Sequence, residues 1–428
     1  MSETASRRPR DAALGFIFAT ALMNSISFGI MIPILPNLIK QFVGGDTAAA
    51  SEWNVLFASA WGLMQFFFGP IMGMLSDRYG RRPVMLLSIF GLFIDFLFMA
   101  FAPSLAWLFL GRVFNGVTAS SFSTGNAYVA DITPPEKRAR NFGIMGSAFG
   151  FGFMIGPTIG GFLGEISLRL PFMAAAGLCL INGLYGLFVL PESLSPERRT
   201  AGINWRRANP LGSLAFLRER SHLLVLAAVG FLYQLSFTAL PTIFVLYTGY
   251  RYGWTPAILG LTFLATGVSQ IVVQMFLVGP VVKRLGERRA VLLGAAGGAA
   301  GFCIYALASS GPLYLIGVPF FAMTGFLQPG LMGLMTRRVG PQNQGQLQGA
   351  NQSLQGIATI VGPPFFGLSF AFAVRNNATL HLPGLPILAS AALLGAAFLV
   401  SLRLARPAHV AAMAGAVTVH EGGAADQS

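Results

Sequence analysis

The stretch Gly143–Gly161 reads GIMGSAFGFGFMIGPTIGG and holds no ionisable side chain. Six spaced positions in it are Gly143, Gly152, Gly156, Pro157, Gly160 and Gly161. In a helix in water each glycine would cost about 1 kcal/mol and the proline about 3 kcal/mol. In a bilayer, glycines let a neighbouring helix approach closely, and surrounding helices can absorb a proline kink. The stretch therefore predicts a kinked, closely packed membrane helix.

The composition places the whole chain in a membrane. Of its 428 residues, 54% are hydrophobic and 10% are charged, and the mean hydropathy is +0.66. A soluble domain averages about 25% charged residues. Cys179 and Cys303 lie in apolar runs and the four histidines are scattered, so we expect no disulfide, no metal site and no cofactor. No nucleophile–base set or phosphate-binding loop indicates an enzyme.

Apolar runs of about 20 residues predict an all-α protein with twelve membrane-spanning helices in two sets of six. The first set covers 13–36, 54–74, 84–102, 105–128, 141–163 and 170–190. The second set covers 222–247, 255–280, 290–308, 311–336, 345–372 and 383–403. We therefore expect a tail over 1–12, a six-helix bundle over 13–190, a linker over 191–221, a second bundle over 222–404 and a disordered tail over 405–428.

The basic residues predict the orientation of the spans. One set of loops and ends holds Arg7, Arg8, Arg10, Arg78, Arg81, Arg82, Lys137, Arg138, Arg140, Lys283, Arg284, Arg288, Arg289, Arg337, Arg338, Arg403 and Arg406. The other side holds Lys40, Arg169, Arg251 and Arg375. Cytoplasmic loops carry the excess of Lys and Arg, so both termini and the linker are expected in the cytoplasm. The net charge of +13 thus reflects the excess of Lys and Arg in the loops expected to be cytoplasmic. We therefore expect no nucleic acid as a partner.

An internal repeat relates the two halves. Gly73–Arg82 reads GMLSDRYGRR after the second span, and Gly279–Arg288 reads GPVVKRLGER after the eighth. The repeat therefore indicates two halves of similar structure that follow each other in the chain.

Two ionisable residues lie inside spans. Arg112, in LFLGRVFNGVTAS, costs about 2.5–3.5 kcal/mol on insertion scales and should face a cavity or a partner. Asn115 continues its helical face. Asp95, in FGLFIDFLFMA, is the only acid in the middle of a span. Burial disfavours its charged form, so Asp95 is the best proton-carrier candidate. The alternative is a neutral acid that is hydrogen-bonded inside the first bundle.

Three motifs carry a resemblance to a known family. The spacing in Gly143–Gly161 resembles the antiporter signature on the fifth helix of drug:proton exporters of the major facilitator superfamily. Gly73–Arg82 resembles the loop signature of that superfamily, with Gly73, Asp77, Arg78, Gly80 and Arg81 in place. The resemblance implies that this loop latches one conformational state and that Arg112 takes part in proton transfer. Asp131 and Arg140 match a loop charge relay; a structural ion pair is the alternative.

A narrower resemblance is to the tetracycline:proton antiporters. It is carried by GRRPVMLLSIFGLFIDFLFMA, AYVADITPPEKRARNFGIMGSAFGFGFMIGP, GPVVKRLGERR and QGQLQG. It implies the major facilitator fold, and Asp95 matches the third-helix acid of that family. The chain departs from the family in having Asn24 and Gly298 at positions where acids are usual.

The resemblance also implies a cavity lined by the first, fourth, seventh and tenth spans. The candidate lining residues are Asn24, Phe28, Met31, Asn115, Gln234, Thr238, Gln270, Gln274, Met323, Phe326, Gln328 and Asn351. Each of these residues could instead form a hydrogen bond between helices. Together they are uncharged and rich in aromatic groups, which favours a bulky, partly apolar ligand.

Two functions remain open at this point. The first is export of a tetracycline-like amphipathic compound in exchange for protons, by alternating access, from a monomer in the bacterial inner membrane. The second is transport of an endogenous lipid-like or other metabolite without obligatory proton coupling, which the missing acids at 24 and 298 favour. A receptor or sensor would call for an appended soluble domain, and neither the linker nor the tail is long enough for one.

Overall fold

The computed structural model describes residues 3–199, 221–339 and 344–403. All regular structure within these ranges is helical. The first half contains α1 (Glu3–Met31), α2 (Leu35–Phe42), α3 (Thr47–Tyr79), α4 (Arg81–Phe101), α5 (Leu105–Thr118), α6 (Ser121–Ile132), α7 (Pro135–Ile166) and α8 (Leu170–Val189). A short 3₁₀ turn, Pro196–Arg198, follows α8.

The second half contains a matching set. Its helices are α10 (Ser221–Phe237), α11 (Ala239–Tyr252), α12 (Pro256–Val272), α13 (Val278–Leu285), α14 (Glu287–Leu307), α15 (Gly311–Ala322), α16 (Leu327–Thr336), α17 (Gln344–Arg375), α18 (Asn377–Leu380) and α19 (Leu385–Leu402). A π-helical turn, Val273–Leu277, joins α12 to α13, and a 3₁₀ turn, Met323–Phe326, joins α15 to α16.

Eleven segments of the described residues are long and apolar enough to cross a membrane. The predicted fourth span, 105–128, is not among them because it is divided into two shorter helices. The chain leaves the helical conformation at Ala119 (ψ 85°) and Ser120 (φ −137°), between α5 and α6. No proline lies in this span, so the break was not expected from the sequence.

The internal repeat recurs in three dimensions. Gly80, between α3 and α4, has φ +111° and ψ 161°, and Gly286, between α13 and α14, has φ +81° and ψ 162°. Only glycine adopts such angles readily, which explains the two repeated glycines. Two residues after each, an arginine donates through Nη2 to a carbonyl near the end of a distant helix. Arg82 binds the oxygen of Leu187 and Arg288 that of Leu402, both at 2.6 Å.

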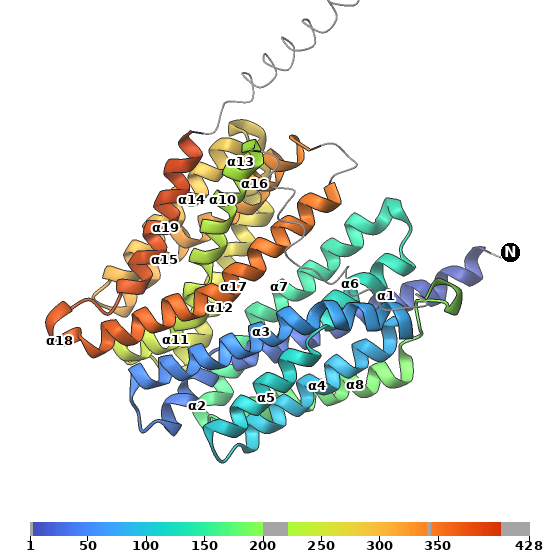
Figure 1. The fold of residues 1–428 in the computed structure, drawn as a ribbon, viewed down its shortest axis with the longest axis horizontal. Helices are drawn as coiled ribbons and strands as arrows, with labels where there is room; N and C mark the ends of the chain where they lie inside the picture. The colour runs from blue at the N-terminus through green and yellow to red at the C-terminus, as the bar shows by residue number, and fades with distance from the viewer. Residues whose placement is uncertain (1–2, 200–220, 340–343, 404–428) are drawn as a thin grey trace, which may run out of the picture.

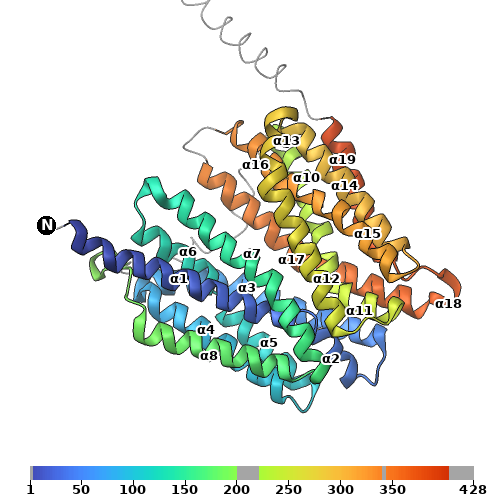
Figure 2. The ribbon, with the colours of Figure 1, turned by 180° about the vertical axis from the view of Figure 1, so that it is seen from behind.

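The two bundles meet at one end and diverge towards the other (Figures 1 and 2). We call the first the closed end. There Ser51 Oγ donates to the Gly367 carbonyl at 2.8 Å, and Asn54 Nδ2 donates to the Thr242 carbonyl at 2.9 Å. Arg375 binds both carboxylate oxygens of Glu52, at 2.5 and 2.9 Å.

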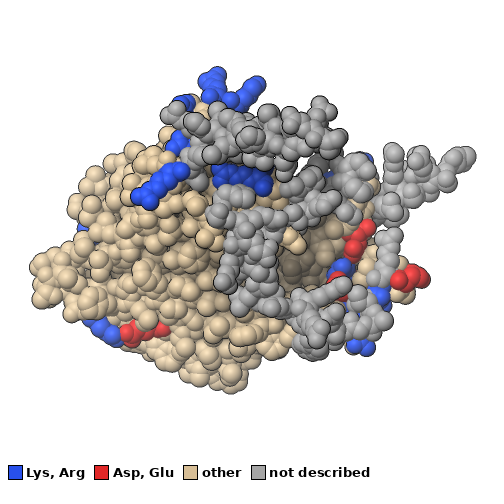
Figure 3. All heavy atoms as spheres, turned by 45° about the horizontal axis from the view of Figure 1, so that its top comes forward, with Lys and Arg blue, Asp and Glu red and all other residues tan. Residues whose placement is uncertain are grey.

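We call the opposite end the basic end, because most lysines and arginines of the described chain gather there. They include Arg78, Arg81, Arg82, Lys137, Lys283, Arg284, Arg288, Arg289, Arg337, Arg338 and Arg403. In Figure 3 basic side chains gather towards the top of the view, and others lie at its right edge beside acidic side chains. The bundles are therefore held together at the closed end and spread apart where the basic residues lie.

Candidate transport site

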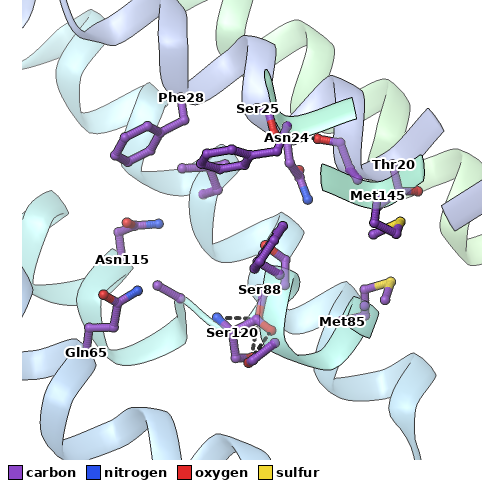
Figure 4. Close-up of a pocket in the computed structure, with 18 of the residues that line it drawn as sticks. Thr20, Asn24, Ser25, Phe28, Gln65, Met85, Ser88, Asn115, Ser120 and Met145 are labelled. Carbon is purple, nitrogen blue, oxygen red and sulfur yellow. Dashed lines mark hydrogen bonds between the residues drawn. The ribbon is translucent and has the colours of Figure 1, made fainter. Parts of the chain in front are cut away.

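A cavity of about 480 Å³ lies inside the N-terminal bundle, between its middle and the basic end. Residues of α1, α3, α4, α5, α6 and α7 form its wall (Figure 4). The wall includes Thr20, Asn24, Ser25, Phe28, Trp61, Gln65, Met85, Ser88, Leu92, Asn115, Ser120, Ser121, Phe122, Ser123, Met145, Phe149 and Phe153. This volume is in the range of pockets that bind drug-sized molecules.

One part of the wall is aromatic. The ring centroid of Phe28 lies 6.0 Å from that of Trp61 and 5.8 Å from that of Phe153, and Phe149 and Phe153 are 4.6 Å apart. Trp61 Nε1 donates to Asn115 Oδ1 at 2.8 Å, which fixes both side chains at the edge of the cavity. The site thus offers flat apolar surfaces beside neutral polar groups.

The break between α5 and α6 forms another part of the wall, and Ser88 of α4 stabilises it. Ser88 Oγ lies 2.6 Å from the Thr118 carbonyl, accepts from the Ser120 backbone N–H at 3.2 Å and lies 2.7 Å from Ser120 Oγ (Figure 4). Irregular backbone at membrane depth is tolerated where it lines a cavity and finds such partners. The broken fourth span therefore belongs to the site.

A buried ion pair lies beside the cavity. Asp95 has no solvent-exposed surface and Arg112 is 4% exposed. Arg112 Nε donates to Asp95 Oδ1 at 3.3 Å, and its Nη2 contacts Asp95 Oδ2. Leu92 and Asn115, each three residues along the same helices, line the cavity. The two intramembrane charges singled out from the sequence thus lie together, one helical turn from the cavity wall.

Gly111 makes room for this pair. A Cβ atom at Gly111 would lie 2.9 Å from Asp95 Oδ1 and 3.0 Å from Phe98 Cβ. Because such distances are shorter than van der Waals contact, a side chain at position 111 would displace the carboxylate. The glycine therefore positions Asp95 against Arg112.

The glycines of α7 pack against two helices. A Cβ at Gly152 would touch Ser25 of α1, one at Gly156 would lie 2.6 Å from the Ile26 carbonyl oxygen, and one at Gly160 would touch the Ile30 carbonyl. Gly161 faces α12, where an added Cβ would touch the carbonyl of Pro256.

Two further residues of the motif have contrasting surroundings. Pro157 faces α1, and a Cβ at Gly29 would lie 2.9 Å from its Cδ. Gly143 has nothing within 4 Å of an added Cβ. The motif thus joins α7 to α1 within one bundle and to α12 of the other.

The loop between α3 and α4 holds a charge cluster. Arg81 donates to Asp77 Oδ1 at 2.5 Å and to Asp131 Oδ2 at 3.0 Å, and Ser193 Oγ donates to the same oxygen of Asp131 at 3.1 Å. These residues all belong to the N-terminal bundle or to the segment that follows it. The side chain of Arg140, the predicted partner of Asp131, lies outside the described residues.

Two other residues of the loop signature lie outside this charge cluster. The Arg78 guanidinium lies 5.3 Å from the Tyr79 ring, and Gly73 has nothing within 4 Å of an added Cβ.

Glu192, assigned from the sequence to the linker, binds the start of α4. Its carboxylate accepts from the backbone N–H of Arg81 at 2.8 Å and of Arg82 at 3.2 Å. It also accepts from the N–H groups of Ser193 and Leu194, at 3.0 and 3.1 Å. A negative charge at a helix N-terminus satisfies unpaired N–H groups and the helix dipole. The acid that caps α4 is therefore Glu192.

Replacing Glu192 by Ala should therefore lower the thermal stability of the protein in detergent. The lost cap is worth about 1–2 kcal/mol, since four N–H groups lose their acceptor. The matched control is Glu197→Ala, which removes an exposed carboxylate five residues later and should leave the melting temperature unchanged. Equal melting temperatures for the two variants would contradict the assigned capping role.

Three of the predicted cavity residues, Asn24, Phe28 and Asn115, line the 480 Å³ cavity. Met31 does not, and is buried in the main apolar core. Thr20, Gln65, Ser88 and Trp61 line the cavity although the sequence did not single them out. Their polar groups are common in membrane helices, so only the packing shows which of them face the cavity.

The candidates of the C-terminal bundle do not line this cavity. Gln270 Nε2 donates to Thr324 Oγ1 at 3.1 Å, Thr238 Oγ1 donates to the Leu235 carbonyl at 2.6 Å, and Asn351 Nδ2 lies 3.4 Å from the sulfur of Met332. Gln274 and Gln328 are exposed, whereas Gln234 is half-buried and Phe326 is buried. The side chain of Met323 packs against Gly297, in the space that a Cβ atom there would need.

Position 298 has no room for an acid. A Cβ at Gly298 would lie 2.5 Å from Thr324 Cγ2 and 2.6 Å from Leu394 Cδ1. The space that an acidic side chain would need is therefore occupied. Within the described residues, no group of three His, Cys, Asp or Glu side chains could hold a metal ion.

Two bundles of membrane-crossing helices, with a cavity and a buried ion pair inside the first of them, are the architecture of a membrane transporter, not of an enzyme. The family model described as Major Facilitator Superfamily matches residues 17–363. The chain belongs to this superfamily, as the sequence predicted, and is a multi-pass protein of the bacterial inner membrane.

Its relatives include tetracycline resistance proteins of Escherichia coli. The class C protein is 38% identical over 351 residues, which cover 82% of this chain and 88% of the relative. The class B protein is 33% identical over 352 residues, covering 82% and 86%. These matches confirm the predicted resemblance to the drug:proton antiporter branch.

Solved structures support the fold. The human organic anion transporter MFSD10 (TETRAN) aligns with a TM-score of 0.66 at 24% identity, covering 92% of this chain and 99% of that one. The nucleoside transporter NupG aligns with a TM-score of 0.73 at 13% identity, covering 92% and 98%. At these identities the likeness concerns the fold alone.

Proposed function

We propose that this protein exports a bulky amphipathic compound of the tetracycline type in exchange for protons, by alternating access. The observation that carries the proposal is the Asp95–Arg112 ion pair, buried one helical turn behind a neutral, aromatic cavity. A buried acid next to a substrate cavity is suited to take up and release a proton. The relatives named tetracycline resistance proteins supply the substrate class.

Proton uptake would change the balance of charges inside the first bundle. Protonation of Asp95 neutralises its carboxylate and leaves the Arg112 guanidinium, 4% exposed, without its counter-charge. An uncompensated charge in the protein interior costs several kcal/mol. That cost is sufficient to shift a two-state population towards a conformation in which Arg112 finds another partner or water.

The positive-inside rule places the basic end in the cytoplasm. On this orientation the molecule is closed on the outer side and the cavity opens inward, ready to accept cargo from the cytoplasm. The charge cluster of Asp77, Arg81 and Asp131 is confined to the N-terminal side, which agrees with a loop latch that is released in this state. The arginine-lined loops would approach each other when the outer side opens.

Replacing Asn54 by Ala should shift the protein towards the outward-open state. The variant loses the hydrogen bond to the Thr242 carbonyl across the closed end, worth about 1 kcal/mol and hence about fivefold in the ratio of the two states. Spin labels on α2 and α18, with Cys179 and Cys303 replaced, would report the distance between the bundles. Asn37→Ala is the control, because Asn37 bonds Pro33 within its own bundle. If the Asn54 variant kept the wild-type distance distribution, the hydrogen bond between Asn54 and Thr242 would not determine which of the two states is populated.

Drug accumulation in efflux-deficient bacteria tests the proposal. Cells that express the protein should accumulate less tetracycline than control cells, and a protonophore should abolish the difference. If the protein left accumulation unchanged, we would assign it the second candidate function, transport of an endogenous lipid-like metabolite. The neutral residue Asn24 and the filled space at Gly298 favour that candidate, since they remove two sites for cation or proton handling.

A further inference from the structure

A second cavity, of about 280 Å³, lies between α1, α6 and α7 towards the basic end. We call it the α1–α7 groove, and it is lined by Gly15, Phe18, Val129, Asn141, Ile144 and Met145. Figure 2 shows α1 and α7 diverging in this direction, with α6 between them. Asn141 is the one polar side chain among these residues, and its Nδ2 already donates to Thr133 Oγ1 at 3.0 Å. The groove therefore suits an apolar occupant.

The groove opens on the surface of the molecule that faces lipid. Ile144 is 41% exposed and begins a row of exposed apolar side chains on α7, which continues with Phe151, Ile155 and Phe162. Their spacing of seven, four and seven residues keeps them on one helix face. The row runs from the basic end to the closed end, where the bundles meet. It therefore lies on the outside of the molecule and not in the space between the bundles.

The charges along the chain place the groove at the cytoplasmic border of the bilayer. Gly15 lies four positions after Asp11, and Asn141 directly follows Arg140. From each of these charges onward, the chain holds no further charged residue for more than about twenty positions, the length of a membrane span. The basic end is the cytoplasmic one by the positive-inside rule. The groove thus lies at the depth where the acyl chains of the inner leaflet begin.

Basic residues lie at the mouth of the groove. Lys137, Asn141 and Met145 follow one another at four-residue spacing, so Lys137 shares their face of α7, one turn beyond Asn141. Lys137 is exposed and has no ion-pair partner among the described residues. In the sequence, segments 1–14 and 133–141 together hold six basic residues, Arg7, Arg8, Arg10, Lys137, Arg138 and Arg140, against three acids, Glu3, Asp11 and Glu136. Basic clusters immediately cytoplasmic of a membrane span attract anionic lipids.

We propose that the α1–α7 groove binds an acyl chain of an anionic phospholipid of the inner leaflet, with the lipid phosphate at Lys137. Met145 lines both this groove and the 480 Å³ cavity and is 4% exposed, so it separates the two. An acyl chain in the groove packs against Met145 and supports that wall of the cavity from behind. The inference does not depend on the proposed export function.

Photo-crosslinking of the full chain in nanodiscs tests the site. The nanodiscs consist of phosphatidylcholine with a trace of phosphatidylglycerol that carries a diazirine in one acyl chain, and the labelled peptides are mapped. Labelling should concentrate on the parts of α1 and α7 that line the groove. Unlabelled phosphatidylglycerol should suppress it at several-fold lower content than further neutral lipid does.

Two variants with matched controls locate the binding. Gly15→Trp fills the groove and should reduce labelling several-fold, whereas Gly177→Trp adds the same ring at an exposed glycine of α8 and should not. Lys137→Gln should raise the phosphatidylglycerol content needed for half-maximal competition about fivefold. Lys283→Gln removes an exposed lysine of α13 in the other bundle and should leave that content unchanged.

Three results would overturn the proposal. Labelling spread evenly over the lipid-facing helices, or equal competition by neutral and anionic lipid, would show only the general lipid layer around the protein. Labelling that Gly15→Trp leaves intact would place the lipid elsewhere. Displacement of the lipid probe by tetracycline would assign the groove to the cargo. Because each measurement reports lipid binding alone, failure of the export function would leave these results unchanged.

Discussion

Replacing Asp95 by Asn is expected to reduce proton-driven efflux to the level of empty membranes. Asparagine keeps the shape of the side chain but cannot take up and release a proton at this site. It also leaves the Arg112 guanidinium, 4% exposed, without its counter-charge. Breaking a buried pair in this way costs about 3–5 kcal/mol. Transport is measured in proteoliposomes with an imposed pH gradient, and stability by thermal unfolding of the same preparations.

The double variant Asp95→Asn/Arg112→Gln separates the chemical role of the pair from its structural role. Because it removes both charges, no uncompensated ion remains, and most of the lost stability should return. Transport should remain absent, since the proton-binding group is still missing. If the double variant regained uphill, proton-dependent efflux, the pair would be a structural ion pair and the proton would travel by another route.

The membrane architecture could be predicted from the sequence because it depends on local properties. Apolar runs, basic loops and the repeated Gly73–Arg82 segment are each visible within a few tens of residues. The spacing of Gly152, Gly156 and Gly160, four residues apart, places them on one helix face. That face is the one that α1 contacts in the structure.

Contacts between distant segments could not be predicted in this way. The break in the fourth span depends on Ser88, which lies some thirty residues before Ser120 and approaches it only when α4 and α5 pack. The cap on α4 comes from Glu192, 111 residues after Arg81. The polar residues of the spans were visible in the sequence, but side-chain direction depends on helix packing. That is why Thr20 and Gln65 were missed and Gln328 was included.

Alanine at Gly156 or Gly160 is expected to cause the second large loss of transport. A methyl group at Gly156 would lie 2.6 Å from the Ile26 carbonyl oxygen and 2.8 Å from Gly29 Cα, and one at Gly160 would touch the Ile30 carbonyl. These are backbone atoms of α1, so no change of rotamer can relieve the contact. The two helices must separate, which costs about 1–3 kcal/mol for each added methyl group.

The separation should affect transport more than the change in volume suggests, because α1 carries Thr20, Asn24 and Phe28 into the cavity. Displacing α1 from α7 therefore moves one wall of the site relative to the others. A distortion of about 1.4 kcal/mol corresponds to a tenfold change in rate, so efflux in proteoliposomes should fall at least about tenfold.

Two glycines of the same helix provide matched controls. Gly150 and Gly143 have nothing within 4 Å of an added Cβ, so Gly150→Ala and Gly143→Ala should keep wild-type efflux. Gly143 is the more informative, because it is the first glycine of the spaced motif and yet an added Cβ there would meet no other described residue. If alanine at Gly143 were as damaging as alanine at Gly156, close packing against α1 would not explain the motif. If only the positions that face α1 were sensitive, the motif would act as the packing surface that holds α1 against α7.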